Sequence, residues 1–212
     1  MGLPVLILGE SGSGKSTSLR NFQKEELVVY NVAGKPLPFR GGTQLLRADN
    51  VSYNTIMQNM SKKKFRCYVI DDSQYLLAFE LFGRVAEKTY DKFTEMAVHF
   101  YDLIQFVIRQ MPPDCIVYFL HHTDDIDGKV KAKTVGKMLN EKLTVEGLFS
   151  IVLMAKNLDG HYVFHIHSDG RDTVKTPMDM FEQDEIDNDL KAVDDAIREY
   201  WGMNGEGDTD GT

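Results

Sequence analysis

The sequence contains no long run of hydrophobic residues and very few cysteines. A helix that crosses a bilayer needs about 20 consecutive apolar residues, and the apolar runs of this 212-residue chain are far shorter. The two cysteines, Cys67 and Cys115, stand apart in the sequence and offer no zinc ligand set. We expect both to be buried free thiols in a reducing compartment. Because no charged, cleavable leader precedes the first apolar run, we expect a cytoplasmic protein with no membrane partner.

The sequence also lacks an excess of positive charge. It has 24 lysines and arginines against 32 acidic residues, a net charge of −8. The acid is concentrated at one end, because residues 182–212 hold eleven acidic and only two basic side chains. An acidic balance disfavours a nucleic-acid binder, although less so when the acid is confined to one segment. We expect one folded core over residues 1–201 and an acidic, disordered tail over residues 202–212.

A complete phosphate-binding loop is present at residues 9–16, with the sequence GESGSGKS, directly after the apolar run Val5–Leu8. A buried strand, a glycine-rich turn and a helix beginning near Lys15 would aim successive N–H groups at one anion. Lys15 would reach the β- and γ-phosphates, and the Ser16 hydroxyl would bind Mg²⁺. The alternative is a chance match in a turn rich in glycine and serine. The residues expected to hold the nucleotide are Gly9, Glu10, Ser11, Gly12, Ser13, Gly14, Lys15, Ser16 and Thr17.

A second motif of nucleotide-hydrolysing proteins follows at residues 69–72, where an apolar strand ends in two carboxylates. If this strand ends at the same sheet edge as the loop, Asp71 would share the Mg²⁺ ion held by Ser16. Asp72 would stand where many such enzymes carry the carboxylate that orients the attacking water. The alternative is a strand that simply ends in a solvated pair of aspartates. We therefore expect ATP and Mg²⁺ as cofactors.

Strand-like and helix-like segments alternate along the chain, which predicts a three-layer α/β fold with a mostly parallel sheet. Residues 148–155 and 162–167 are expected to form a hairpin, and Glu185–Trp201 an amphipathic helix.

Another buried strand, Ile116–Leu120, ends in two histidines. In one branch of phosphate-loop proteins such a strand lies between the loop strand and the Mg²⁺-aspartate strand, and its tip senses the γ-phosphate. His121 occupies that position and His122 is the weaker candidate, unless both merely cap the strand end.

Three segments together resemble one family, the phage-encoded RecA-like core ATPases. They are residues 9–16, residues 69–76 (VIDDSQYL) and residues 116–125 (IVYFLHHTDD). The resemblance covers roughly residues 3–200. Characterised members are single-strand annealing recombinases. The resemblance implies a P-loop NTPase with a RecA-like sheet, ATPase activity, binding to single-stranded DNA, and assembly into a ring or filament beside a single-stranded DNA-binding protein.

RecA-like ATPases bind DNA through two loops, and the resemblance places the second of these at Thr123–Lys142. Flexible lysines in a loop suit sequence-independent contact with a phosphate backbone. The candidate DNA-binding residues are Lys129, Lys131, Lys133 and Lys137. The first loop would correspond to Phe82–Phe93, whose aromatic residues either stack on bases or pack under the loop. A third basic cluster, residues 62–66, is interpreted as a solvated helix end.

The family also resembles RecA in placing the nucleotide between subunits, where a basic residue of one subunit reaches its neighbour's γ-phosphate. Lys175 matches that position best and Arg171 is the second candidate; either would otherwise be a solvated turn residue.

Two other functions stay open. One is a small-molecule or nucleotide kinase, although the lid candidate 123–142 has lysines and no arginine. The other is an assembly module that uses the nucleotide only as a switch, without DNA binding.

Overall fold

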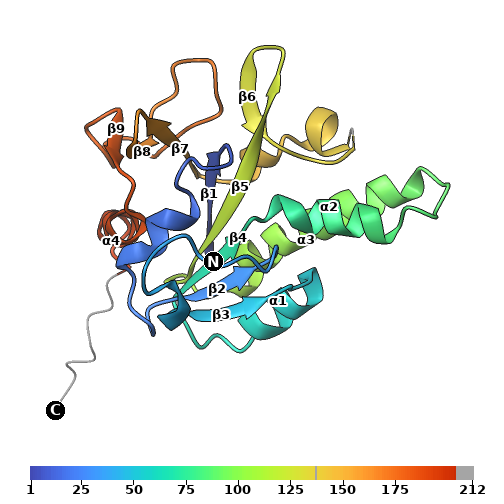
Figure 1. Cartoon of the computed structure of the whole chain (residues 1–212), viewed down its shortest axis with the longest axis horizontal. Coiled ribbons are helices and arrows are strands. Elements are labelled where there is room, and N and C mark those ends of the chain that lie inside the picture. Colours follow the sequence, from blue (N-terminus) through green and yellow to red (C-terminus); the bar gives the residue numbers. More distant parts are fainter. Residues whose placement is uncertain (137, 204–212) are drawn as a thin grey trace.

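The computed structural model describes residues 1–136 and 138–203, and within them nine strands form one sheet (Figure 1). The strands are β1 (Leu3–Gly9), β2 (Val28–Asn31), β3 (Leu46–Asp49), β4 (Cys67–Asp71), β5 (Ile116–Ile126), β6 (Lys129–Ala132), β7 (Ile151–Leu158), β8 (His161–His165) and β9 (Glu185–Asp187). The helices are α1 (Tyr53–Met60), α2 (Gln74–Gly83), α3 (Asp91–Gln110) and α4 (Leu190–Tyr200), with the short helical segments η1 (Ser16–Asn21), η2 (Gly42–Gln44), η3 (Met138–Leu143) and η4 (Val145–Leu148).

The central strands are parallel, and their order places β5 between the two motif strands. The sheet runs β3-β2-β4-β5-β1-β7-β8-β9, with β6 paired only to β5. All pairs from β3 to β7 along this order are parallel, whereas β7–β8 and β8–β9 are antiparallel. The carboxyl ends of β1 and β4 therefore meet at one rim of the sheet with the tip of β5 between them. The extra strand predicted between the two motif strands is thus confirmed.

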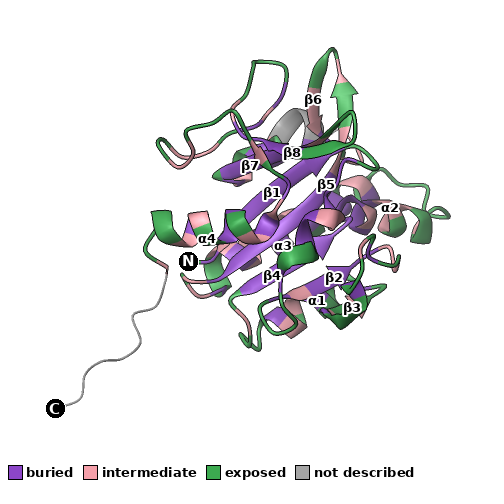
Figure 2. Cartoon of the chain, turned by 60° about the vertical axis from the view of Figure 1, so that its left-hand side comes forward, coloured by how far each residue is buried: buried purple, intermediate pink, exposed green. Residues whose placement is uncertain are grey.

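Two hydrophobic cores, one on each face of the sheet, make the fold three-layered. Successive residues of a strand point to opposite faces, and β1 divides accordingly. Leu6 and Leu8 pack with side chains of α1, α2 and α3 on one face. Val5 and Ile7 pack with η1 and α4 on the other. Figure 2 shows the central strands as a buried layer between these helices. The three-layer α/β fold with a mostly parallel sheet is therefore as predicted, including the hairpin of β7 and β8 and the helix at the carboxyl end.

Two helices differ from their predicted extent. The helix expected after the phosphate loop is a six-residue 3-10 helix, η1, with Lys15 at its N-cap position. The helix expected over Glu185–Trp201 begins only at Leu190, because the carboxylate of Asp189 accepts hydrogen bonds from the backbone N–H groups of the first turn. Residues 185–187 instead form β9 at the edge of the sheet. The apolar periodicity that predicted a longer helix there includes Ile186, which pairs with β8.

The segment Thr123–Lys142 is not the loop that was predicted. Its first part continues β5 beyond the sheet and pairs with β6 in an antiparallel hairpin, which turns at Asp127 and Gly128. Gly128 has a φ of +76°, a conformation that glycine adopts without steric cost. Backbone pairing fixes this part of the segment. From residue 204 on, the predicted acidic tail lies outside the described residues, and so does Lys137.

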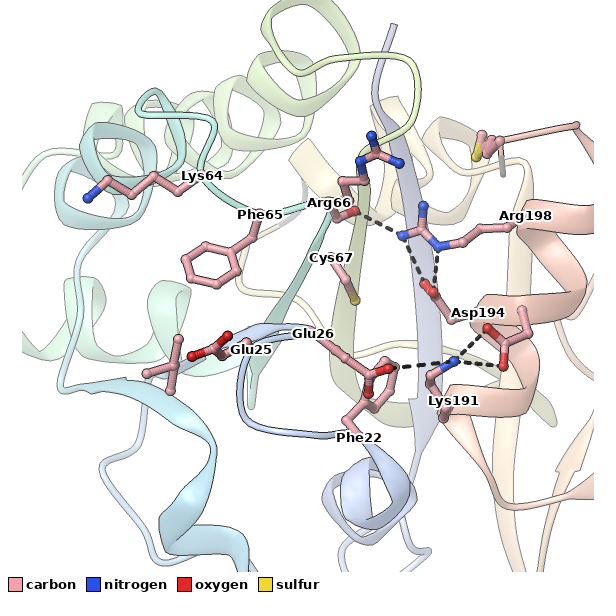
Figure 3. Close-up of a pocket in the computed structure, with 13 residues that line it drawn as sticks. Phe22, Glu25, Glu26, Lys64, Phe65, Arg66, Cys67, Lys191, Asp194 and Arg198 are labelled. Atoms are coloured by element: carbon pink, nitrogen blue, oxygen red, sulfur yellow. Dashed lines mark hydrogen bonds and ion pairs between the residues drawn. The ribbon is translucent and has the colours of Figure 1, made fainter. Parts of the chain in front are cut away.

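A cavity of about 800 Å³ lies at the opposite rim of the sheet from the phosphate loop. Cys67, the first residue of β4, lines it together with residues of α4 (Figure 3). Asp194 accepts a 2.6 Å bond from Arg198 and a 2.8 Å bond from the Tyr118 hydroxyl of β5. These bonds fix α4 to the sheet. Both cysteines are buried and free, as predicted.

Replacement of Phe100 by alanine is expected to destabilise the fold strongly. This α3 side chain is fully buried against Phe119 and His121, and truncation of such a phenylalanine costs about 3–5 kcal/mol. The matched control is Phe82→Ala, because Phe82 is 72% exposed and such a substitution changes stability by less than about 0.5 kcal/mol. Urea denaturation followed by circular dichroism measures both. Equal effects of the two substitutions would contradict the assignment of the core.

Candidate nucleotide-binding site

The phosphate loop connects β1 to η1 and folds around its own lysine. The Lys15 ammonium donates to the carbonyl oxygens of Gly9 at 2.7 Å and Glu10 at 2.8 Å. Burial lowers the pKa of Lys15 to about 8, and the nearby carboxylates of Asp72 and Asp71 offset only part of that effect. A buried cation held only by neutral carbonyls gains strongly from an anion. The loop therefore has the electrostatics of a phosphate site.

Two glycines of the loop have backbone conformations that other residues rarely adopt. Gly12 has a φ of +79° and Gly14 a φ of +96°, both in the left-handed region. A side chain at Gly14 would also collide with Tyr162 of β8, whose Cδ1 lies 2.7 Å from the position of an added Cβ. Tyr162 thus packs directly on the phosphate loop. This contact could not be predicted from local sequence patterns, because β8 is more than 140 residues away.

Ser16 and Asp71 meet at the rim of the sheet. The Ser16 hydroxyl donates a 2.8 Å hydrogen bond to Oδ1 of Asp71. Burial raises the pKa of Asp71 to about 6, together with the negative charge of Asp72. A hydroxyl and a carboxylate are hard oxygen ligands of the kind that Mg²⁺ prefers, and Mg²⁺ in such sites takes its other ligands from phosphates and water. The two residues therefore fit a magnesium ion that arrives with a nucleotide.

Asp72 has a different environment from Asp71, although the two are adjacent. Its φ of +60° lies in the left-handed region, which aspartate tolerates better than most residues. Oδ2 lies 2.6 Å from the ammonium of Lys35, and Oδ1 lies 3.2 Å from Nε2 of His122. Burial alone would raise the pKa of Asp72, but these hydrogen bonds outweigh it and hold the pKa below its usual value. Asp72 is thus a weakly basic carboxylate with a partner on each oxygen.

His121 does not line the cavity that contains Lys15 and Asp71. The sequence had instead predicted that His121 would sense the γ-phosphate. It is fully buried, with Nδ1 2.8 Å from the Ser73 hydroxyl and Nε2 2.7 Å from the Lys133 carbonyl. Burial lowers the pKa of His121 to about 4, so the ring is neutral. Because a carbonyl can only accept, Nε2 carries the proton and Nδ1 accepts from Ser73. The neighbouring His122 points to the opposite side of the strand and is the histidine that lines the cavity.

A cavity of about 390 Å³ brings these groups together. Its lining residues are Ser11, Gly12, Gly14, Lys15, Ser16, Thr17, Lys35, Pro36, Pro38, Asp71, Asp72, His122 and Tyr162. Sequence reasoning missed Lys35, which follows β2. One signal was available, since the residue stretch after any parallel strand lies at the rim where β1 and β4 end. A second cavity, of about 620 Å³, lies between the loop and residues 154–160 of the β7–β8 hairpin.

Three of the four candidate DNA-binding lysines lie on or next to the β5–β6 hairpin, and the fourth, Lys137, is outside the described residues. Lys129 and Lys131 belong to β6, and Lys133 follows it. Because these residues are two positions apart, Lys129 and Lys131 point to the same face of the hairpin. Asp124 lies directly opposite Lys131 in the hairpin. Opposite charges at such a position attract, which reduces the positive potential that this face presents. The sequence-based prediction did not include this acidic neighbour.

Lys175 and Arg171 both lie in the connection between β8 and β9, outside the lining of the phosphate cavity. The backbone of Lys175 forms an isolated antiparallel bridge with Val152 of β7, and its side chain is exposed. The carbonyl of Arg171 accepts a 2.8 Å bond from the N–H of Val130 in β6. Neither side chain acts on the phosphate loop of its own chain. A role in a neighbouring subunit's site stays a prediction.

Within residues 1–136 and 138–203, no group of three or more histidine, cysteine or acidic side chains could hold a metal ion. In the same part of the chain, no helix is both long enough and apolar enough to cross a bilayer.

No protein-family model matches the sequence, and no curated protein matches it either. Among solved structures, one similar chain is described as a prototypical ATPase from the type III secretion system of pathogenic bacteria. The two are 11% identical, with a TM-score of 0.43 over 73% of this chain and 51% of the other. This chain thus spans about half the length of that structure. So distant a likeness does not indicate what the chain binds, and function is inferred from the site itself.

Proposed function

We propose that this chain is a Mg²⁺-dependent ATPase that acts as an oligomer on single-stranded DNA. The 2.8 Å contact between Ser16 and Asp71 carries the proposal, since it joins the phosphate loop to the carboxylate of the second motif. Residues 9–17 would hold the triphosphate, as in other phosphate-loop proteins. Residues 1–201 would form the ATPase core, and residues 202–212 the acidic tail.

Hydrolysis would be an in-line displacement at the γ-phosphorus. The water oxygen bonds to phosphorus, the bond to the bridging oxygen of the diphosphate breaks, and the water proton passes to phosphate. Mg²⁺ held by Ser16 and Asp71 would neutralise charge on the phosphate oxygens. Lys15 would leave the carbonyls of Gly9 and Glu10 to bind the β- and γ-phosphates. Such preorganised charge lowers the barrier without any covalent step by the protein.

Asp72 is the group proposed to orient the attacking water. It lies next to Asp71 and lines the cavity, which is where a nucleophile would enter on the γ side of the metal. Its pKa is held low, so it accepts a hydrogen bond from water more readily than it removes a proton. His122, which contacts the same carboxylate, takes the sensing position that the sequence analysis gave to His121.

The DNA-binding part of the proposal rests on the lysines of the β5–β6 hairpin and on the resemblance to RecA-like recombinases. The hairpin projects beyond the sheet (Figure 1), so its exposed Lys129 and Lys133 are accessible to a phosphate backbone. The proposed role is single-strand annealing, with a single-stranded DNA-binding protein as a further partner. Lys175 would act across the subunit interface.

Steady-state ATP hydrolysis with and without single-stranded DNA tests the proposal. The protein is expected to hydrolyse ATP faster when DNA is added, and Lys15→Ala is expected to reduce the rate at least about 100-fold, because it removes a cation from the transition state. Lys24→Ala, at an exposed lysine outside the cavity, is the matched control. Phosphate transfer to an added acceptor would instead indicate a kinase, and tight binding without turnover a nucleotide switch.

Asp71→Asn is expected to remove most of the gain in nucleotide affinity that Mg²⁺ provides. A charged ligand to the ion is lost, which corresponds to about 10- to 100-fold in affinity. Binding of ATP without metal should change little. Titration calorimetry with and without Mg²⁺ measures the difference, and Asp114→Asn, at the opposite rim, is the control. If Mg²⁺ strengthened binding equally in both variants, the proposed metal site would be wrong.

Replacing Lys129, Lys131 and Lys133 together by alanine is expected to weaken single-stranded DNA binding and its salt dependence. Each lost phosphate contact lowers the slope of log affinity against log salt by about 0.7, so three contacts give about 2. Fluorescence anisotropy of a labelled oligonucleotide at several salt concentrations measures the slope. The control replaces Lys62, Lys63 and Lys64, which removes the same charge elsewhere. The DNA-binding assignment fails if the control lowers the slope as much.

A further inference from the structure

Lys35 reaches the phosphate cavity from a segment that belongs to neither nucleotide-binding motif. Its ammonium lies 2.6 Å from Oδ2 of Asp72 and 5.4 Å from the centre of the Tyr75 ring. Its side chain is 60% exposed, whereas that of Asp72 is 7% exposed. Lys35 lines the same cavity as Lys15 and Asp71. The cavity therefore holds two lysine ammonium groups, one from the loop and one from the connection after β2.

The backbone at Lys35 is fixed even though its side chain is not buried. The amide of Asn31, at the end of β2, donates a 2.6 Å bond to the Lys35 carbonyl. The same amide donates to the carboxylate of Asp49 at 2.8 Å, and it is almost fully buried. Pro36 and Pro38, which also line the cavity, restrict the chain that follows. A fixed backbone with a flexible four-carbon stem allows the ammonium to change partners within the cavity.

The present partner of Lys35 would compete poorly with a terminal phosphate. Asp72 carries one negative charge and already accepts a bond from His122. A γ-phosphate carries more negative charge and more acceptor oxygens than a carboxylate, and charge-assisted bonds to phosphate are strong. Asp72 is the residue proposed to orient the attacking water, which enters at the γ-phosphate, so a cation beside Asp72 would meet the γ-phosphate and not the β-phosphate.

We propose that Lys35 is a γ-phosphate ligand supplied by the same chain, which exchanges Asp72 for the phosphate when a nucleoside triphosphate binds. The exchange frees one oxygen of Asp72 for the attacking water and makes the site distinguish a triphosphate from a diphosphate. This inference rests on the proposed nucleotide site. A lysine that only neutralised Asp72 would affect both nucleotides alike.

The test compares dissociation constants for Mg²⁺-ADP and for the Mg²⁺ complex of a non-hydrolysable ATP analogue, so no turnover is needed. The intact protein is expected to bind the analogue more tightly. Lys35→Met is expected to lose about 10-fold or more in affinity for the analogue and to keep its affinity for ADP within about twofold. Lys35→Arg keeps the charge and is expected to retain most of the preference.

Lys64→Met is the matched control, because Lys64 lines the cavity at the opposite rim (Figure 3). It is expected to bind both nucleotides as the unmodified protein does, and thermal melting confirms that each variant is folded. If Lys35→Met kept the preference for the analogue, or lost affinity for both nucleotides equally, the inference would be overturned while the nucleotide site stood. If the unmodified protein bound neither nucleotide, the proposed function itself would fail.

Discussion

The site depends on one contact between buried polar groups, the 2.8 Å hydrogen bond from Ser16 to Asp71. Parallel pairing of β1 and β4 with β5 brings the two residues to one rim. Burial of the charged groups around this contact is electrostatically costly: it raises the pKa of Asp71 to about 6 and lowers that of Lys15 to about 8. Both shifts have the same cause, loss of water around a charge. Magnesium and phosphate would supply the opposite charges that each group lacks, so ligand binding would relieve a cost built into the fold.

The two adjacent aspartates show how position alone separates two roles. Asp71 ends β4 with its side chain towards Ser16, and its pKa is raised. At Asp72 the backbone turns into the left-handed region, which directs its carboxylate to Lys35 and His122 and lowers its pKa. Environments that push two pKa values apart assign different tasks to chemically identical groups. The first suits a metal ligand whose charge a bound cation would stabilise, and the second a carboxylate that stays ionised.

The sequence predicted what local spacing determines. The phosphate loop and Asp71 were recognised because their residue types follow apolar strands directly, and the three-layer fold followed from the alternation of strands and helices. The sequence-based prediction favoured His121, whereas His122 lines the cavity. Neighbouring strand residues face opposite sides, and nothing local shows which side faces the cavity. Lys35 was missed because its position depends on where β2 lies in the sheet, which is a long-range property. The β5–β6 hairpin was predicted as a loop because its mostly polar residues lack the apolar pattern that indicates a strand.

His122 belongs to both the phosphate cavity and the hairpin, which gives the two proposed activities a shared residue. Its ring contacts Asp72, while its backbone carbonyl accepts a 2.8 Å bond from the N–H of Lys133. On the opposite side of the strand, the ring of His121 donates to the carbonyl of that same lysine. Lys133 is therefore held by both histidines at the point where the hairpin returns to the sheet. The histidine pair thus joins the phosphate cavity to the base of the hairpin through the backbone of one lysine.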